Sequence, residues 1–567
     1  MHNDNSRVAR IVAICRVTLH VGTLLVFLCA VLSPLAAQST QTSAPTPVPA
    51  FSTENGPDAT RPTHITPEQA QQLFSSVDSI LKFDSENTGL PILHTVKRRL
   101  VTREEVEHYL MQQLHDDRDA KRLERSELVL KKFGLLDRDF QLQPFLIQLL
   151  REQIAGYYND KTKTVNLLDW IPPADQKPVL AHELTHALQD QHIDLEKWDE
   201  QSDQTIAKNV QQDNRHIAKD EDDTVRDAIV EGQAMAVFID YALAPSGKTL
   251  LTAPDLVNKM TQAMGDDTDS PTLANAPLLL QRSLIFPYTY GLNFVRDVLF
   301  AQGRHAAFTG LLDHPPSSTY EIMTPKVYLK HETVPVLRMP DIHPLIDAQY
   351  RPYDIGVMGE FDVRMVAELF GGPGAAKALA PAWRGGIYYT AQSKAFTAQS
   401  KKAKTSGEQD STASLALLYL SRWATPKAAQ AFAAMYAREV PRKYDHAIAE
   451  PNESPSSGDA GEVTRIWNTP EGPVLIVVSG RTVYISESFP MELARKLQLV
   501  MMGSIANSSG SEIVESSPQQ KELTAGLRDW LFKLGIPQVA LREHEKDRSG
   551  GCYRSREGTV ASVATVY

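Results

Sequence analysis

The sequence predicts an α+β fold: a mainly helical first domain that contains a small β-hairpin, followed by a C-terminal α+β domain. Three observations predict this class. Before about residue 340, apolar residues recur at helical spacing, as in 142–150. Between 156 and 167, aromatic and β-branched residues flank an Asn-Asp pair, which is the pattern of a hairpin. Beyond 340, short strand-like runs alternate with amphipathic helical segments.

Length and composition exclude some classes of function. A chain of 567 residues is long enough for two to four domains. Its 42% hydrophobic and 22% charged residues are ordinary values for a globular protein. The net charge of -11 argues against a nucleic-acid partner or an anionic membrane surface, because both require a basic face.

Residues 1–37 have the pattern of a secretory signal peptide. Three arginines precede an apolar run from Val17 to Leu32, and Leu35-Ala36-Ala37 offers a small-residue cleavage site. We therefore expect a protein that is secreted or periplasmic in a bacterial cell envelope. The alternative is an uncleaved N-terminal anchor, which would be the only link to a membrane. Cleavage would leave Cys552 as the single cysteine, so no internal disulfide is expected.

Composition places the other boundaries. Residues 38–65 are rich in Ser, Thr and Pro and are expected to form a disordered linker. Residues 66–340 form the expected first domain, which begins with a Thr-Pro-Glu helix start. Residues 341–540 form the expected C-terminal α+β domain. Residues 541–567 are polar and rich in Gly and Ser, and we expect a poorly ordered tail.

Individual elements follow from local signals. Thr102 stands three residues before Glu105, which is a capping-box pattern at a helix start. Residues 194–223 are strongly polar and predict an excursion loop that is partly helical. In the first domain, further helices are expected at 178–191, 224–243 and 290–300. In the second, strands are expected at 386–389, 413–418, 463–467, 474–478 and 483–485, with helices at 426–440 and 491–502.

The helix expected at 178–191 carries a metal-binding pattern, His182-Glu183-Leu184-Thr185-His186. Residues four apart are neighbours on a helix surface, so His182 and His186 can reach one cation. Glu183 is displaced around the helix and can address a water activated by the metal. The competing interpretation is a surface helix with two unrelated histidines.

Zinc needs a third protein ligand, and Glu231 is the candidate. It stands in an otherwise apolar helical segment, where a carboxylate is costly unless it has a partner such as a metal. The alternative is a helical glutamate that reaches solvent or an arginine. Asp190 and Asp227 are candidates to orient a ligand histidine; alternatively Asp190 is a solvated helix end and Asp227 pairs with Thr224 as a capping residue.

Together these motifs resemble those of a known family. His182-Glu183-x-x-His186 followed by Glu231-Gly232-x-Ala234 resembles the gluzincin signature, and Pro287-Tyr288-x-x-Gly291 resembles a segment of the aminopeptidase N family. The resemblance covers about 140 residues, 156–291. It implies a thermolysin-like catalytic domain that holds one Zn²⁺ per chain through His182, His186 and Glu231. It also implies that Glu183 acts as the general base and Tyr288 stabilises the transition state.

Two departures from that family limit what the resemblance implies. The stretch from His186 to Glu231 is longer than in the family, and the Gly-x-Met-Glu-Asn segment that recognises a free amino terminus is absent. We therefore expect a zinc endopeptidase acting on a peptide or protein substrate, with exopeptidase activity left open. A substrate strand could add to the hairpin, or the hairpin is plain scaffold.

Several alternatives remain open at this stage. Tyr288 could be a packed core aromatic residue, and Tyr290 is its rival for the donor role. The whole protein could be a non-catalytic envelope binding or scaffold protein with a structural or vestigial metal site. The sequence leaves the oligomeric state and the physiological substrate undetermined.

Overall fold

The computed structural model describes residues 64–114, 117–153, 156–199, 209–255, 258–259, 271–403, 411–451 and 462–506. All of these lie in the first of two compact units, residues 1–512. The expected signal peptide, the expected tail and all but the last two residues of the expected linker lie outside the described residues. The α+β class is confirmed, because long helices accompany two separate sheets. The domain boundary near residue 340 stays a prediction.

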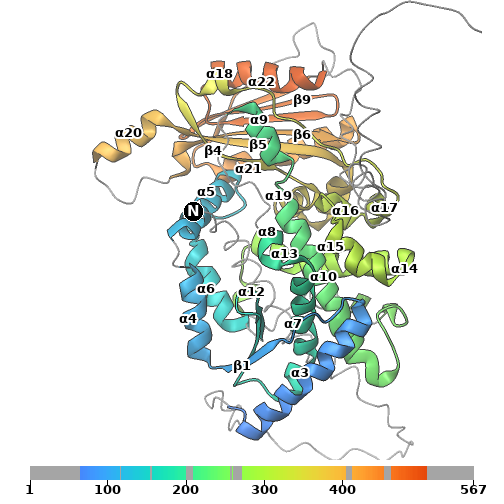
Figure 1. Ribbon diagram of the computed structural model, residues 1–567. Coiled ribbons are helices and arrows are strands. Elements are labelled where there is room, and N and C mark those ends of the chain that lie inside the picture. The colour runs from blue at the N-terminus through green and yellow to red at the C-terminus, as the bar shows by residue number, and fades with distance from the viewer. Residues whose placement is uncertain are drawn as a thin grey trace, which may run out of the picture. The chain divides into compact units, whose positions relative to one another are not determined.

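The chain up to residue 329 is mainly helical and contains a small sheet (Figure 1). Its elements are α3 (Pro67–Thr88), β1 (Lys97–Val101), α4 (Arg103–Leu114), α5 (Asp117–Phe133), α6 (Leu142–Gln153), β2 (Tyr157–Asn159), β3 (Thr164–Leu168), α7 (Pro173–Ile193), α8 (Leu195–Asp199), α9 (Val210–Ile217), α10 (Asp222–Leu243), η1 (Ala244–Ser246), α12 (Pro271–Ala274), α13 (Leu278–Phe286), η2 (Pro287–Gly291), α14 (Leu292–Gln302), η3 (Ala306–Gly310), α15 (Leu311–Asp313), α16 (Thr319–Met323) and α17 (Pro325–Leu329).

The helix starts read from the sequence are correct in two cases and wrong in a third. Thr66 caps α3 and Thr102 caps α4, each through reciprocal bonds with a Gln or Glu three residues on. The third helix, α10, begins at Asp222 after the N-cap residue Glu221. Asp227 therefore lies inside the helix, and its predicted capping role is wrong.

The predicted hairpin is confirmed as β2 and β3. The small sheet has the order β1-β3-β2, with β1 parallel and β2 antiparallel to β3. Since β2 is an edge strand of this sheet, one side of its backbone faces away from β3. On that side the backbone N–H of Tyr158 donates a hydrogen bond of 2.8 Å to Glu183 of α7.

The chain from residue 343 onward forms a larger sheet with the order β4-β5-β6-β10-β9-β8-β7, antiparallel throughout. Its elements are α18 (His343–Ile346), β4 (Tyr350–Val357), α19 (Glu360–Leu379), η4 (Ala380–Ala382), β5 (Trp383–Ser393), α20 (Lys394–Ala403), η5 (Thr412–Ser414), β6 (Leu415–Trp423), α21 (Pro426–Lys443), β7 (Ile448–Ala449), β8 (Val463–Thr469), β9 (Gly472–Ser479), β10 (Thr482–Glu487) and α22 (Met491–Ala506).

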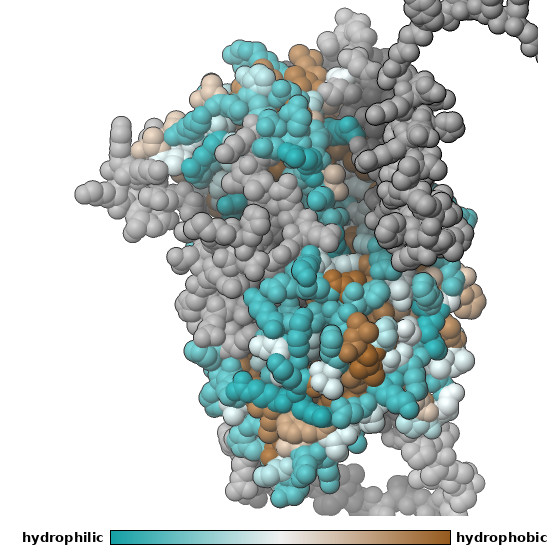
Figure 2. All heavy atoms as spheres, viewed as in Figure 1, coloured by the Kyte–Doolittle hydropathy of each residue, from teal (hydrophilic) through white to brown (hydrophobic). Residues whose placement is uncertain are grey.

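The larger sheet is buried on both faces, so its central strands read as continuous apolar runs. In β6, Leu415, Leu417 and Tyr419 face one core, whereas Leu418 and Leu420 face the other. Helix α21 covers the first face, and α18 and α22 cover the second (Figure 1). On the side of the molecule drawn in Figure 2, the described surface is mainly hydrophilic. Within the described residues, no helix has the length and apolarity needed to cross a bilayer.

The polar excursion between α7 and α10 is partly helical, as predicted. Its helix α9 contacts the region that precedes the larger sheet: Asp213 Oδ2 lies 3.0 Å from His343 Nε2, and Asn214 bonds to both backbone groups of Met339. Ile217 is buried in the core under α18 and α22. The long stretch from His186 to Glu231 therefore includes a segment that packs on a distant part of the chain.

Helix α10 and the π-helical turn η2 touch backbone to backbone. A Cβ at Gly232 would lie 2.4 Å from the carbonyl carbon of Gly291, and a Cβ at Gly291 would lie 2.1 Å from the carbonyl oxygen of Ala228. Real Cβ contacts are never this short, so only glycine fits at both positions. The Glu231-Gly232 segment and the Pro287–Gly291 segment therefore pack directly against each other through their glycines.

Substitution of Gly232 by Ala should separate this contact and lower the free energy of unfolding by about 3 kcal/mol, the upper end of the usual cost of overpacking. Chemical denaturation measures the change. Gly374→Ala is the matched control, because nothing lies within 4 Å of its added Cβ and Ala favours helix over Gly. Equal stabilities of the two variants would contradict the close contact.

Acidic side chains gather at the start of α10. Glu221 Oε1 accepts hydrogen bonds from the backbone N–H of Thr319 at 3.1 Å and from its hydroxyl at 2.5 Å. Burial raises the pKa of Glu221 to about 8, and Asp362 and Asp220 add to the shift. Burial likewise raises the pKa of Asp362 to about 7. The folded chain therefore holds protons here that the unfolded chain has released.

Stability should consequently fall as the pH rises. An unfolded glutamate loses its proton near pH 4.5, whereas folded Glu221 keeps it up to about pH 8, so its stabilising effect is lost across that interval. We expect the Tm of metal-free protein to drop between about pH 4.5 and about pH 8, and Glu221→Gln to flatten the curve. Parallel curves for the two proteins, measured by calorimetry, would contradict this assignment.

Candidate metal centre

Helix α7 is buried on every side along its second half. All residues from Val179 to Asp190 are buried, and Leu180, Leu184 and Leu188 are fully enclosed in the main core. The histidines leave the helix on a different side from these leucines, as predicted. Because polar groups inside a core are costly without partners, each polar side chain on this helix should have a specific one.

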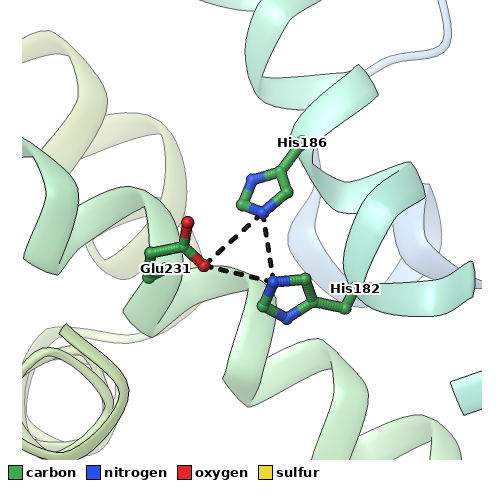
Figure 3. A group of neighbouring side chains, drawn as sticks. All are labelled: His182, His186 and Glu231. Atoms are coloured by element: carbon green, nitrogen blue, oxygen red, sulfur yellow. Dashed lines mark hydrogen bonds and ion pairs between the residues drawn. The ribbon is translucent and has the colours of Figure 1, made fainter. Parts of the chain in front are cut away.

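His182, His186 and Glu231 meet in the space between α7 and α10 (Figure 3). The two Nε2 atoms of the histidines lie 3.1 Å apart. Glu231 Oε2 lies 3.1 Å from Nε2 of His182 and 3.6 Å from Nε2 of His186. All three residues are buried. The predicted ligand set is thus brought together from helices that are distant in sequence.

The donor set fits a metal ion. Two imidazole nitrogens and one carboxylate oxygen face one point, and three ligands at zinc distances in a tetrahedral site lie about 3.3 Å from one another. Two lone pairs on facing nitrogens would repel each other unless a proton or a cation lay between them. The group could therefore hold a metal ion; imidazole and carboxylate suit several divalent metals, so geometry alone leaves the metal's identity open.

Without a metal, the cluster behaves as an ion pair. Burial alone would raise the pKa of Glu231, but the charge of His186 and hydrogen bonds from both imidazoles outweigh burial and hold the pKa at about 2. Burial alone would lower the pKa of His186, but Glu231 raises it to about 9. Glu231 is therefore held in its charged form beside His186, whose protonated form it favours.

Glu183 lies beside the cluster and does not join it. Its Oε2 accepts a hydrogen bond of 2.8 Å from the backbone N–H of Tyr158, on the outward side of β2. Its Oε1 is buried without a hydrogen-bond partner among the described residues. Burial raises the pKa of Glu183, although both histidines act against the shift. The carboxylate is thus held by one oxygen, and the other makes no hydrogen bond within the described part of the chain.

Asp190 holds the hairpin and contacts neither histidine. Its carboxylate accepts bonds from the Tyr158 hydroxyl at 2.7 Å, from Lys163 Nζ at 2.7 Å and from the backbone of Leu195 at 3.1 Å. The predicted role of orienting a ligand histidine is therefore wrong for Asp190. The reason is geometric: Asp190 lies two turns beyond Glu183 on the face that meets the hairpin. The same role for Asp227 stays a prediction.

A glutamine, which the sequence analysis did not single out, contacts the second histidine. Gln189 Oε1 lies 2.8 Å from His186 Nδ1, and Gln189 is fully buried. The available signal was a polar residue three positions after a ligand on a buried helix. That signal is weak, because buried glutamines such as Gln176 on the same helix bond only to backbone.

Of the two tyrosines considered for the donor role, Tyr288 lies beside the metal cluster. Its ring is fully buried, 6.4 Å from the His182 ring and nearly parallel to it at 23°. Tyr290 instead stacks on Phe286 at 5.2 Å, with the guanidinium of Arg364 5.9 Å from its ring centre. Both belong to the turn η2, whose glycine contact with α10 places Tyr288 next to the ligands.

Comparison of the chain with protein-family models, with curated proteins and with solved structures finds no match. No family is therefore assigned. The gluzincin resemblance and the thermolysin-like fold stay predictions, whereas the buried His-His-Glu group is a feature of this chain's own structure.

Proposed function

We propose that this protein is a secreted zinc-dependent peptide-bond hydrolase of the gluzincin type, with a thermolysin-like catalytic arrangement. One observation carries the proposal: the three predicted ligands converge with an adjacent buried carboxylate, Glu183, that is not a ligand. A closed structural site has no use for that carboxylate, whereas hydrolysis requires a base at this place.

The chemistry follows from the positions of this chain's residues. Zinc held by His182, His186 and Glu231 would supply Lewis acidity, which brings the pKa of water toward about 7 and polarises a carbonyl group. Glu183 accepts a proton from the attacking water through its free oxygen and later delivers it to the leaving amine. Its raised pKa suits both transfers, because a base that is too acidic would not take the proton.

Tyr288 is the proposed donor to the developing oxyanion. Its ring lies against that of His182, one ligand of the cluster. A single well-placed donor of this kind is worth about 3–4 kcal/mol of transition-state stabilisation. Its position depends on the Gly232–Gly291 contact, since that contact sets the distance between the ligand helix and η2.

The substrate would be a peptide or protein, cut within the chain. An extended peptide could lie along β2, but the outward N–H of Tyr158 is already bonded to Glu183. At Tyr158 a substrate peptide could therefore bond only to the backbone carbonyl. It would make fewer backbone hydrogen bonds to β2 than a regular added strand makes.

A second candidate function is a non-catalytic envelope protein with a structural or vestigial metal. The observation that favours it is burial, because His182 and Tyr288 are 0% exposed and Glu183 is 1% exposed. Against it, a structural zinc site normally has four protein ligands, and the described residues bring together three. Zinc binding without hydrolysis of any peptide would select this alternative.

Glu183→Gln should abolish hydrolysis and leave metal binding intact. The amide still accepts the bond from Tyr158 but cannot take a proton, so cleavage should fall by a factor of about 100 to 10,000. Digestion of a peptide library by the wild-type protein and the variant, with metal analysis of both, measures the change. Cleavage at equal rates by the two proteins would sink the proposal.

Glu231→Gln should weaken zinc binding by more than about 100-fold. Removing a residue that only hydrogen-bonds to a metal ligand already costs about 10- to 100-fold, and Glu231 is a proposed ligand itself. Competition with a chelating dye measures the affinity. Glu360→Gln removes a carboxylate that is similarly buried, at 3% exposure, but belongs to α19, so zinc binding should be unchanged. A matching loss in both variants would indicate general destabilisation and refute the ligand role of Glu231.

A further inference from the structure

Two buried glutamines link a metal-ligand candidate to a distant turn of the chain. Gln189 Oε1 lies 2.8 Å from His186 Nδ1, and Gln189 Nε2 donates to Gln233 Oε1 at 2.9 Å. Gln233 Nε2 donates in turn to the backbone carbonyls of Ala307 and Phe308, at 2.8 and 2.9 Å. Both glutamines are 0% exposed. A continuous row of hydrogen bonds therefore runs from α7 through α10 to η3.

The direction of this row is determined at its far end. Backbone carbonyls can only accept, so the amide nitrogen of Gln233 must face Ala307 and Phe308. Its oxygen then faces Gln189, which must present its own nitrogen; the carbonyl of Val230, 3.0 Å from that nitrogen, requires the same orientation. The oxygen of Gln189 is left for His186.

The consequence for His186 concerns its tautomer. Since Gln189 Oε1 can only accept, Nδ1 of His186 must carry the proton and donate it. In a neutral imidazole the lone pair then belongs to Nε2, the atom that faces His182 and Glu231. This is the form in which a histidine binds a metal through Nε2.

The turn η3 makes this arrangement possible. Its π-helical geometry differs from the regular α-helical bonding pattern, and here two successive carbonyls face Gln233. The other π-helical turn, η2, lies at the opposite end of α14 and holds Tyr288. The two turns that flank α14 thus both contact the ligand helix α10.

We propose that Gln189 and Gln233 are positioning residues that hold His186 in its metal-binding tautomer. The backbone carbonyls of η3 fix the orientation of the Gln233 amide, and Gln233 fixes that of Gln189. The inference rests on the proposed metal function of the cluster and adds to it the groups that set the metal affinity. Loss of an outer contact of this kind typically weakens metal binding 10- to 100-fold.

The test compares Gln189→Met with Gln176→Met. Methionine has a similar length and shape but lacks the amide, and Gln176 is an equally buried glutamine of α7 whose three bonds go to Leu168 and Ile171 only. Zinc affinity is measured by chelator competition on the full chain. We expect Gln189→Met to bind zinc about 10- to 100-fold more weakly, and Gln176→Met to bind like wild type although its Tm falls.

A second readout follows the tautomer itself. Long-range proton–nitrogen NMR of the zinc-loaded protein should show a protected Nδ1–H on His186 in wild type and Gln176→Met, and faster exchange in Gln189→Met. Should Gln189→Met fail to fold, Gln233→Met breaks the row one bond further away and should also weaken zinc binding.

The possible failures can be told apart. Zinc affinity in Gln189→Met within twofold of Gln176→Met would overturn the positioning role while leaving the metal site intact. Equal weakening in both methionine variants would likewise overturn it, because the effect would then be one of general packing. No zinc bound by wild type would overturn the proposed function and this inference with it.

Discussion

The contact between α7 and α10 is the constraint on which the rest of the structure depends. Two imidazoles from one helix and a carboxylate from the other meet in the interior, and all three residues are buried. Charged groups buried in this way are tolerated only when they neutralise one another or share a cation. The glycine contact with η2, the hairpin held by Asp190 and the glutamine row to η3 all fix the position of one or other of these helices.

The pKa values of two neighbouring carboxylates shift in opposite directions, because their partners differ. Glu231 faces both imidazoles and its pKa is lowered to about 2, whereas Glu183 accepts one backbone bond and its pKa is raised by burial. One carboxylate is thus suited to remain charged as a ligand and the other to exchange a proton. Such a division of pKa values within one site is typical of acid–base chemistry.

Some elements were predictable from the sequence and others were not. The helix start at Thr66, the capping box at Thr102 and the hairpin are local signals, and the structure confirms them. The helical segment α19 was missed, because its backbone is kinked at Gly372, where φ is 79°, and Pro373 follows; the Gly-Gly-Pro-Gly sequence at this break is typical of a loop. Within α7, Asp190 was one of two candidates to orient a ligand histidine, with a solvated helix end as its alternative, whereas in the structure its neighbour Gln189 contacts His186.

By itself, the sequence determined the ligand candidates. Once the segment is helical, the four-residue spacing places His182 and His186 on the same side of the helix. Glu231 is an acidic residue within an apolar helical stretch, where it needs a partner. Only the tertiary structure decided that Glu231 meets them, that Tyr288 is the ring beside His182 and that Gln189 faces His186. These contacts join helices that are far apart in the chain. They depend on packing, including two glycines that let backbones touch, and no local pattern encodes that distance.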